Sequence, residues 1–131
     1  PRDEYYRPER TDGTLMCHFR HQAHDDPFFW PGLQDLTAWV DFSRLARAAT
    51  AHGFEVAGYA SQAQFLMGGG LDIELQDIAS LPAEKRLALS SEVKTLTLPG
   101  EMGERFKCIA LRKGSIETPT AFNLADRTHT L

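Results

Sequence analysis

Three histidines and two adjacent aspartates lie close together near the start of this sequence, and their side chains could perform chemistry. The histidines are His18, His21 and His24, and Asp25 and Asp26 follow directly. Imidazole and carboxylate groups together suit zinc, iron or nickel. In a strand, however, positions 18 and 21 point to opposite faces, and the spacing of a helical HExxH motif is absent. The spacing therefore disfavours a metal site and leaves two interpretations: polar lid residues that donate hydrogen bonds, or direct contacts to a substrate.

A second group of polar residues follows in the segment QDLTAWVDF. Asp35 and Asp41 flank a short apolar link that contains Thr37. Asp41 is a good N-cap for a helix, and Asp35 could cap a turn. The alternative is that Asp35 and its neighbours bind a cation, because carboxylates form charge-assisted hydrogen bonds with a guanidinium. Gln62 follows an expected strand, where α/β sheets present ligand contacts, although simple exposure explains it equally well.

Several common catalytic motifs are missing from the sequence. It contains no GxSxG, P-loop or CxxC motif, so nothing supports a nucleophilic hydrolase, a nucleoside triphosphatase or a thiol-redox protein. The glycines at 68–70 end an expected helix, whereas a phosphate loop needs glycines before a helix. Cys17 and Cys108 sit in alternating apolar runs, which predicts two buried thiols rather than a disulfide.

The composition is that of one globular domain or of part of one. The 131 residues are 42% hydrophobic and 24% charged, which excludes a largely disordered chain. The formal net charge of -4 disfavours nucleic-acid binding. No apolar run approaches the roughly 20 residues that cross a bilayer, and no signal peptide opens the chain. We expect a soluble protein in a reducing compartment.

Periodicity and turn residues predict an α/β order of elements. Residues 1–13 read as an exposed connection, 14–20 as a strand and 21–37 as a long aromatic-rich loop. The later elements are a helix over 41–52, a strand over 54–60, a short helix after the N-cap Ser61, helices over 71–79 and 82–95, a connection over 95–102, a strand buried on both sides over 106–111, and an aperiodic tail. These strands are too few for an independent doubly wound sheet. We therefore expect a fragment, as the start at Pro1 without Met also suggests.

Three separated blocks of this chain resemble the C-terminal part of the MidA family of S-adenosylmethionine-dependent methyltransferases, which includes the mitochondrial complex I assembly methyltransferase. The blocks are GTLMCHFRHQAHDDPFFWPGLQDLTAWVDF, YASQAQFLMGGGL and LPGEMGERFKCIAL. The resemblance covers residues 5–113 and implies a class I methyltransferase fold, a Rossmann-like α/β sheet whose final strand is antiparallel. Residues 54–60 would be its sixth strand and 106–111 its seventh.

The resemblance further implies that these residues are the C-terminal fragment of a single methyltransferase domain. Its parts would be a connection at 1–13, a substrate-side insertion or lid at 14–40, a helix–strand–helices–strand region at 41–114 and a tail at 115–131. S-adenosyl-L-methionine would be the cofactor, bound mainly by an N-terminal half, because the glycine-rich loop and the acidic residue that follows it do not occur here. The fragment alone is expected neither to bind the cofactor nor to be active.

By the same resemblance, the substrate would be an arginine side chain of a protein. Asp35 would align the guanidinium as the catalytic residue, Thr37, Asp41 and Gln62 would shape the pocket, and the segment from His18 through His21 to His24 would be its lid. The implied location is the cytoplasm in a bacterium and the mitochondrial matrix in a eukaryote. The missing half of the enzyme would be one partner, and the exposed edges of an incomplete sheet predict self-association.

A non-catalytic interaction module is the alternative hypothesis. In it, the aromatic loop at 27–33 docks a partner protein, as exposed aromatic clusters often do. A glycine-rich cofactor loop in the same protein would distinguish the enzyme from the module. A metal enzyme that uses the histidines is a third and weaker hypothesis.

Overall fold

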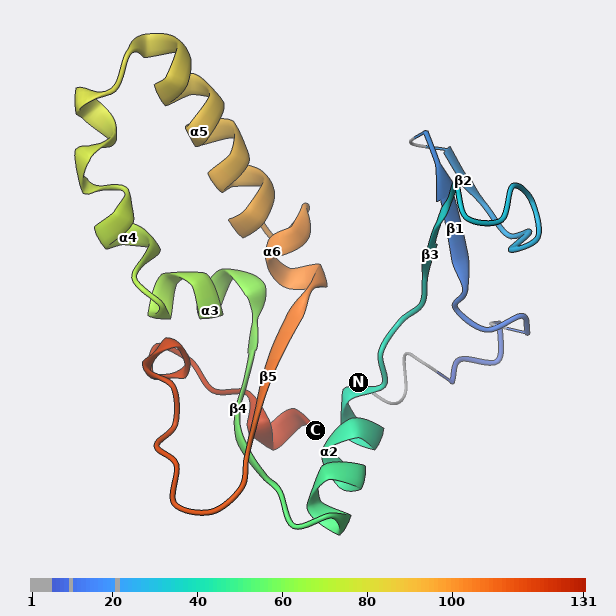
Figure 1. The fold of residues 1–131 in the computed structure, drawn as a ribbon. Coiled ribbons are helices and arrows are strands. Elements are labelled where there is room, and N and C mark those ends of the chain that lie inside the picture. Colours follow the sequence, from blue (N-terminus) through green and yellow to red (C-terminus); the bar gives the residue numbers. More distant parts are fainter. Residues whose placement is uncertain (1–5, 10, 21) are drawn as a thin grey trace. The chain divides into compact units, whose positions relative to one another are not determined.

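The computed structural model describes residues 6–9, 11–20 and 22–131, and it divides into two compact units, Pro1–Leu45 and Ala46–Leu131 (Figure 1). Within the described residues, no helix is both long enough and apolar enough to cross a membrane.

The first unit is built on a three-stranded antiparallel sheet in the order β2-β1-β3. Its strands are β1 (Met16–Phe19), β2 (Gln22–His24) and β3 (Asp35–Thr37). The prediction of a strand over 14–20 is confirmed, but the prediction of a loop over 21–37 is wrong at both ends, where β2 and β3 lie. Each is only three residues long, too short to show an alternating pattern, and each depends on backbone hydrogen bonds to β1.

The two faces of this sheet differ in burial. Residues directly opposite each other in antiparallel strands share a face. Cys17 lies opposite both His24 and Leu36; Cys17 is completely buried and His24 half-buried, whereas Leu36 is exposed. His18 lies opposite Ala23 and Asp35 on the other face. There, Ala23 and Asp35 are exposed and His18 is half-buried.

The first helix, α2 (Phe42–Ala51), begins and ends where the sequence predicts. The Asp41 carboxylate accepts a hydrogen bond from the backbone N–H of Arg44 at 2.9 Å, which satisfies a donor that the helix itself cannot pair. Gly53 follows the helix with φ of +78°, a left-handed conformation that glycine adopts at low cost. The predicted helix over 41–52 is confirmed.

The second unit contains one antiparallel pair of strands and the helices between them. β4 (Glu55–Ser61) pairs with β5 (Lys107–Arg112). The helices are α3 (Gln62–Gly68), α4 (Leu71–Glu74), η1 (Gln76–Ser80), α5 (Ala83–Thr97), α6 (Met102–Arg105), η2 (Thr120–Phe122) and η3 (Thr128–Thr130). α3 and α6 lie together at the end of the pair where β4 ends and β5 begins (Figure 1).

Most of these elements match the predictions, and the differences have physical causes. The predicted helix over 71–79 is split into α4 and the 3-10 turn η1, and α6 occupies the end of a region predicted as a connection. Strand β5 is half-buried along most of its length, and Leu111 is exposed, so the prediction of a strand buried on both sides is wrong. Only β4 pairs with β5 among the described residues, and one neighbour cannot cover both faces and both edges.

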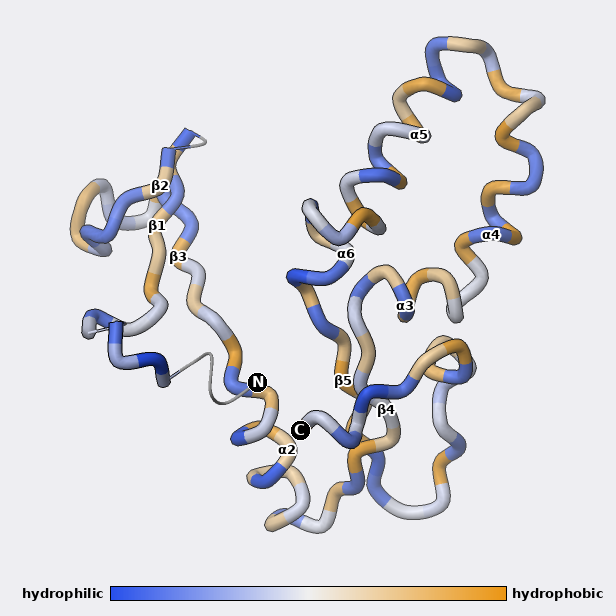
Figure 2. The backbone as a smooth tube through the Cα atoms, turned by 180° about the vertical axis from the view of Figure 1, so that it is seen from behind, coloured by the Kyte–Doolittle hydropathy of each residue, from blue (hydrophilic) through white to orange (hydrophobic). Residues whose placement is uncertain are grey.

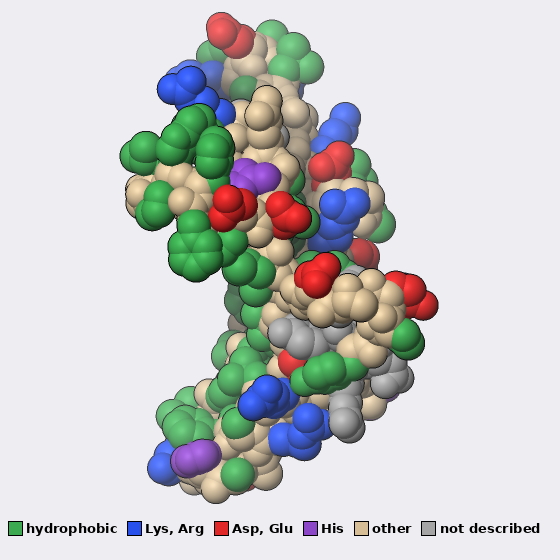
Figure 3. All heavy atoms as spheres, turned by 90° about the vertical axis from the view of Figure 1, so that its right-hand side faces the viewer, with side chains coloured by type: hydrophobic (Ala, Val, Ile, Leu, Met, Phe, Trp, Pro, Cys, Tyr) green, Lys and Arg blue, Asp and Glu red, His purple; other side chains and the backbone are tan. Residues whose placement is uncertain are grey.

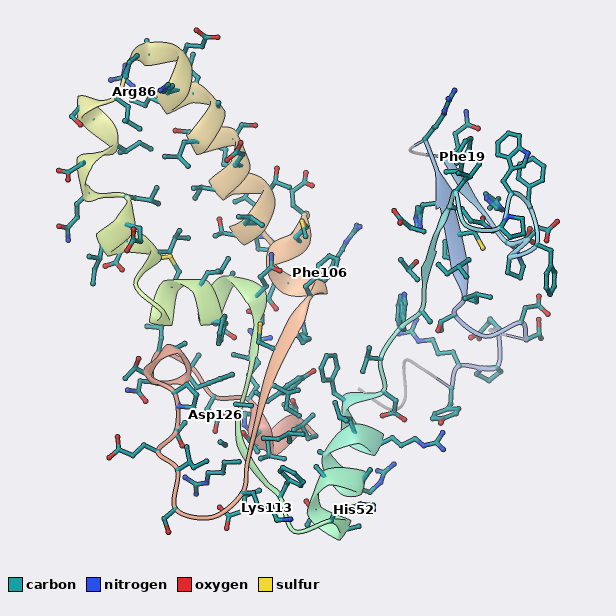
Figure 4. All side chains as sticks on the ribbon, in the orientation of Figure 1. Phe19, His52, Arg86, Phe106, Lys113 and Asp126 are labelled. Carbon is teal, nitrogen blue, oxygen red and sulfur yellow. The ribbon has the colours of Figure 1, made fainter. Side chains whose placement is uncertain are left out.

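The tail after Gly114 packs against β4 instead of fraying. Ala121 and Phe122 are buried, and the Phe122 ring occupies the space beside Gly58. The backbone N–H of Tyr59 donates to the Asp126 carboxylate at 3.1 Å, and the Tyr59 carbonyl accepts from the N–H of Arg127 at 2.7 Å. Asp126 accordingly lies beside β4 in Figure 4. The tail thus closes the edge of β4 that faces away from β5.

Apolar surface remains exposed on the helices of this unit. Orange stretches lie along α4 and α5 in Figure 2, and Ile73 and Leu87 are 63% and 71% exposed. Exposed apolar surface of this kind is typical of a region that contacts further protein.

Candidate active site

Three of the predicted site residues lie on one face of the first sheet. Asp35 in β3 is the direct cross-strand partner of His18 in β1, and such pairs have Cβ atoms about 5 Å apart. Thr37 lies on the same face two residues along, and its hydroxyl donates to the Met16 carbonyl at 3.0 Å. The sheet therefore places a carboxylate and an imidazole side by side, with Thr37 fixing the register of β3.

The Asp35 and His18 side chains are available to a ligand. Among the described residues, neither side chain has a hydrogen-bond or ion-pair partner. Asp35 begins β3 and its carboxylate makes no hydrogen bond to a turn within the described residues, so the alternative that it caps a turn is wrong. An exposed carboxylate next to an imidazole can bind a planar cation and accept a proton.

His24 does not join this pair, because it lies on the opposite face of the sheet. Its ring meets the Phe29 ring edge-on, with 5.6 Å between the centroids. Both ring nitrogens are buried and have no hydrogen-bond partner in the described part of the chain. His21 lies outside the described residues. The histidines at 18 and 24 therefore do not line a common surface.

No metal centre emerges from these side chains. The described residues contain no group of three or more His, Cys, Asp or Glu side chains that could hold a metal ion. Cys17 lies on the same face as His24 and is a buried thiol, as predicted; burial together with the charges of Asp26 and Asp25 raises its pKa. Cys108 is only half-buried, and burial raises its pKa as well.

Asp41 and Gln62 hold elements in place. One Asp41 oxygen caps α2, and the other is buried without a hydrogen-bond partner in the described part of the chain. Gln62 belongs to the second unit, where its side-chain amide donates to the Leu96 carbonyl at 2.9 Å and its backbone N–H donates to the Phe106 carbonyl at 2.9 Å. These bonds tie α3 to the end of α5 and to the start of β5. A role for either residue in a substrate pocket stays a prediction.

Sequence reasoning missed a cluster of charges at the carboxyl end of β4. The Arg127 guanidinium pairs with both Glu104 carboxylate oxygens, at 3.0 and 3.3 Å, and the Lys107 ammonium lies 3.7 Å from the same carboxylate. Burial raises the pKa of Glu104, but the hydrogen bonds from Arg127 and Ser61 and the nearby positive charges outweigh it, so the net pKa lies below the ordinary value. No signal in the aperiodic tail predicts this pairing.

Asp126, in the same tail, has a lowered pKa for a related reason. The Thr128 hydroxyl donates to its carboxylate, and this bond, with those from the backbone N–H groups of Tyr59 and Thr128, outweighs the effect of burial. The ionised carboxylates of Asp126 and Glu104 thus hold the tail to β4 and to α6, respectively.

Acid is therefore expected to loosen the tail. In the folded protein, the pKa values of Glu104 and Asp126 lie below their ordinary values of 4.5 and 3.8. The two carboxylates therefore stabilise the fold fully above these ordinary values, and the stabilisation is lost as the pH falls through the folded pKa values. Urea unfolding from neutral pH down to about pH 3 should show the midpoint falling in acid. Glu104→Gln with Asp126→Asn should flatten this dependence. The exposed control Glu117→Gln should keep it, and an unchanged slope in the double variant would contradict this assignment.

Comparison with known proteins shows which proteins this chain is similar to. A family model described as "Putative S-adenosyl-L-methionine-dependent methyltransferase" matches residues 1–60. The chain is 40% identical over 105 residues to the mitochondrial protein arginine methyltransferase NDUFAF7 of Mus musculus, a match that covers 78% of this chain and 23% of the relative. It is 36% identical over 109 residues to the homolog from Drosophila melanogaster, covering 81% and 24%. The chain spans about a quarter of the length of these curated relatives.

Solved structures agree with this similarity. One is a crystal structure of a "likely methyl transferase" from Burkholderia thailandensis bound to S-adenosyl-homocysteine, 44% identical, with a TM-score of 0.86 over 100% of this chain and 34% of that one. A native crystal structure from the same organism gives a TM-score of 0.85 at 44% identity, covering 100% and 35%. The family model, the relatives and the shared fold agree with the resemblance of this chain to the MidA family of S-adenosyl-L-methionine-dependent methyltransferases.

Proposed function

We propose that this chain forms the substrate-side part of an S-adenosyl-L-methionine-dependent methyltransferase that methylates arginine side chains of proteins. The observation that carries the proposal is 40% identity, over 78% of the chain, to a protein arginine methyltransferase. The related structure with bound S-adenosyl-homocysteine supports the same cofactor chemistry.

The pair of Asp35 and His18 supports the choice of arginine. A carboxylate can hold a guanidinium through two parallel charge-assisted hydrogen bonds, which orients the planar group. The exposed position of Asp35 at the start of β3 leaves room for a ligand. His18, its cross-strand neighbour, has an imidazole nitrogen that can accept a hydrogen bond or a proton.

These two residues would bind and align the acceptor. Methylation of a guanidinium nitrogen needs that nitrogen to be correctly oriented and to lose a proton, so positioning accounts for most of the acceleration. Asp35 would hold the guanidinium, and His18 would take the proton that leaves the methylated nitrogen. The methyl group would come from the sulfonium of S-adenosylmethionine.

The described residues do not fit the cofactor itself. The turn from β4 into α3 has no glycine, and a capping box already fills the helix start: the Ser61 hydroxyl accepts from the N–H of Gln64, and the Gln64 side chain accepts from the N–H of Ser61. The glycines at 68–70 follow α3 instead of preceding it. The proposal therefore assigns cofactor binding to a part of the enzyme outside these residues.

The strand pairing supports a place at the end of a larger sheet. β4 and β5 are antiparallel, as expected for the last two strands of a class I methyltransferase. The tail closes one edge of β4, while β5 has one edge that no described strand covers. We infer that this edge of β5 continues the sheet into the cofactor-binding half, with residues 14–40 as the insertion on the substrate side.

Titration calorimetry tests whether cofactor binding belongs to a part of the enzyme outside these residues. S-adenosylmethionine should give no micromolar binding to the 131-residue chain alone and clear binding to the complete enzyme. S-adenosylhomocysteine provides a matched second ligand. Micromolar binding by the chain alone would contradict the assignment of the cofactor to the other half.

A further inference from the structure

The aromatic loop, residues 27–33, exposes a group of large apolar side chains between β2 and β3. Phe28 is 83% exposed and Leu33 71%, while Phe29 and Trp30 are 46% and 48% exposed. Figure 3 shows hydrophobic side chains gathered beside acidic ones on the face that it views. Such a patch is larger than the scattered apolar residues of an ordinary surface, and it is typical of an interaction site.

The aromatic loop is held in one conformation although it is exposed. The Asp26 carboxylate accepts from the N–H of Phe28 at 2.9 Å, and the Gln34 side chain donates to the Pro27 carbonyl at 2.8 Å. The Trp30 ring stacks on that of Phe29 at 4.3 Å. It also meets the Phe19 ring, which Figure 4 labels, edge-on at 4.5 Å. A partner would therefore bind a preformed surface at low entropic cost.

The backbone of the loop is strained at its centre. Trp30 has φ of +50°, a left-handed conformation that costs a bulky residue on the order of 1 kcal/mol. Strain of this kind persists where the surrounding contacts impose it, and it clusters at binding surfaces.

The charge of the segment indicates the kind of partner. Residues 22–43 contain four Asp and no Glu, Lys or Arg, so they carry -4, which equals the formal net charge of the entire chain. Asp25 and Asp26 directly precede the aromatic loop, and Asp35 follows Gln34 at its end. Aromatic faces and carboxylates together recognise guanidinium groups through cation–π contacts and charge-assisted hydrogen bonds.

One guanidinium lies next to the aromatic loop. The Arg20 guanidinium lies 5.4 Å from the centroid of the ring of its chain neighbour Phe19, and that ring contacts Trp30 of the loop. An arginine side chain therefore already packs on a ring that adjoins the loop. A second copy of the same acidic segment, by contrast, would be repelled.

We propose that the aromatic loop is a docking surface for a basic, arginine-containing segment of the protein substrate, separate from the arginine that is methylated. This inference rests on the proposed function, because it assigns the loop to the same substrate. Only Gln34 separates the loop from Asp35 in the chain, and an extended peptide covers about 3.3 Å per residue. A few substrate residues would thus link the docking segment to the methylated arginine.

Fluorescence anisotropy on the complete enzyme tests the proposal. The probe is a labelled Gly/Ser peptide with several arginines, and its control has glutamine at the arginine positions. Phe28→Ala should weaken binding of the arginine peptide about 2- to 5-fold, the range of exposed cation–π contacts. Adding Asp25→Asn should weaken it further, to about tenfold in total. Leu124→Ala, which removes an equally apolar and 61% exposed side chain elsewhere, should leave binding unchanged.

Several results would overturn the docking proposal. The glutamine peptide could bind as tightly as the arginine peptide, or Leu124→Ala could weaken binding as much as Phe28→Ala does. Sedimentation could also show a dimer of the enzyme that Phe28→Ala separates into monomers without weakening peptide binding. If Phe28→Ala left the KM for the protein substrate unchanged while methyl transfer continued, the docking proposal would be overturned and the proposed function would stand. Loop-dependent binding without any methyl transfer would support docking and contradict the proposed function.

Discussion

Replacing Asp35 with asparagine is expected to slow methyl transfer by the complete enzyme about 10- to 100-fold, because a charge-assisted hydrogen bond is worth about 1.5 to 3 kcal/mol. Asparagine keeps the shape of the side chain but loses the negative charge that would hold a guanidinium. The affinity for S-adenosylmethionine should stay unchanged. Steady-state kinetics with an arginine peptide and calorimetry with the cofactor measure the two quantities separately.

A matched control is available on the second unit. Asp72 is an exposed aspartate on α4, and Asp72→Asn should change neither the rate nor the affinity. His18→Gln should lower the rate, since a glutamine side chain cannot take up the proton that leaves the methylated nitrogen. A loss of rate in Asp35→Asn with an equal loss of cofactor affinity would argue against a substrate role for Asp35.

The largest effect on stability is expected at Gly103 in α6. A Cβ atom there would lie 2.1 Å from the Thr97 carbonyl oxygen and 2.4 Å from the Thr97 carbonyl carbon. These are backbone atoms, which cannot swing away as a side-chain tip can. Gly103→Ala should therefore lower the free energy of unfolding by about 3 kcal/mol through overpacking, as measured by urea unfolding of the chain.

Gly100 is the matched control for this substitution. It lies in the connection between α5 and α6, just before the helix that contains Gly103, and a Cβ atom there would meet nothing within 4 Å. Gly100→Ala should be neutral or stabilise the fold by up to about 1 kcal/mol, because alanine restricts the unfolded chain. Similar unfolding midpoints for the two variants would mean that α6 does not pack against the end of α5 as observed.

The helices and longer strands were predictable because their signals are local. Asp41 and Gly53 bound α2, and Ser61 begins α3, each with the capping contact that its residue type predicts. Strands β2 and β3 were not predictable, since each forms only against β1. The packing of Phe122 against Gly58 likewise joins positions far apart in the chain, and no local pattern encodes it.

The residue types of the candidate site were predictable, but their grouping was not. The family resemblance made His18 and His24 members of one lid, yet the antiparallel pairing of β1 and β2 sets His24 opposite Cys17, on the other face of the sheet from His18. The same pairing scheme brings Asp35 directly opposite His18 from the far side of the aromatic loop. The closeness of Asp35 and His18 depends on the register of the sheet, and the register is known only from the structure.

Transfer of a labelled methyl group is the most direct measurement of arginine methylation. The complete enzyme would be incubated with S-adenosylmethionine that carries an isotopic label in its methyl group and with a protein extract from source cells that lack the enzyme. The proteins would then be hydrolysed, and the labelled amino acid identified by mass spectrometry. We predict labelled methylarginine with wild-type enzyme and much less with Asp35→Asn. Label in another amino acid or in a small molecule, or no label in any product, would contradict the assignment.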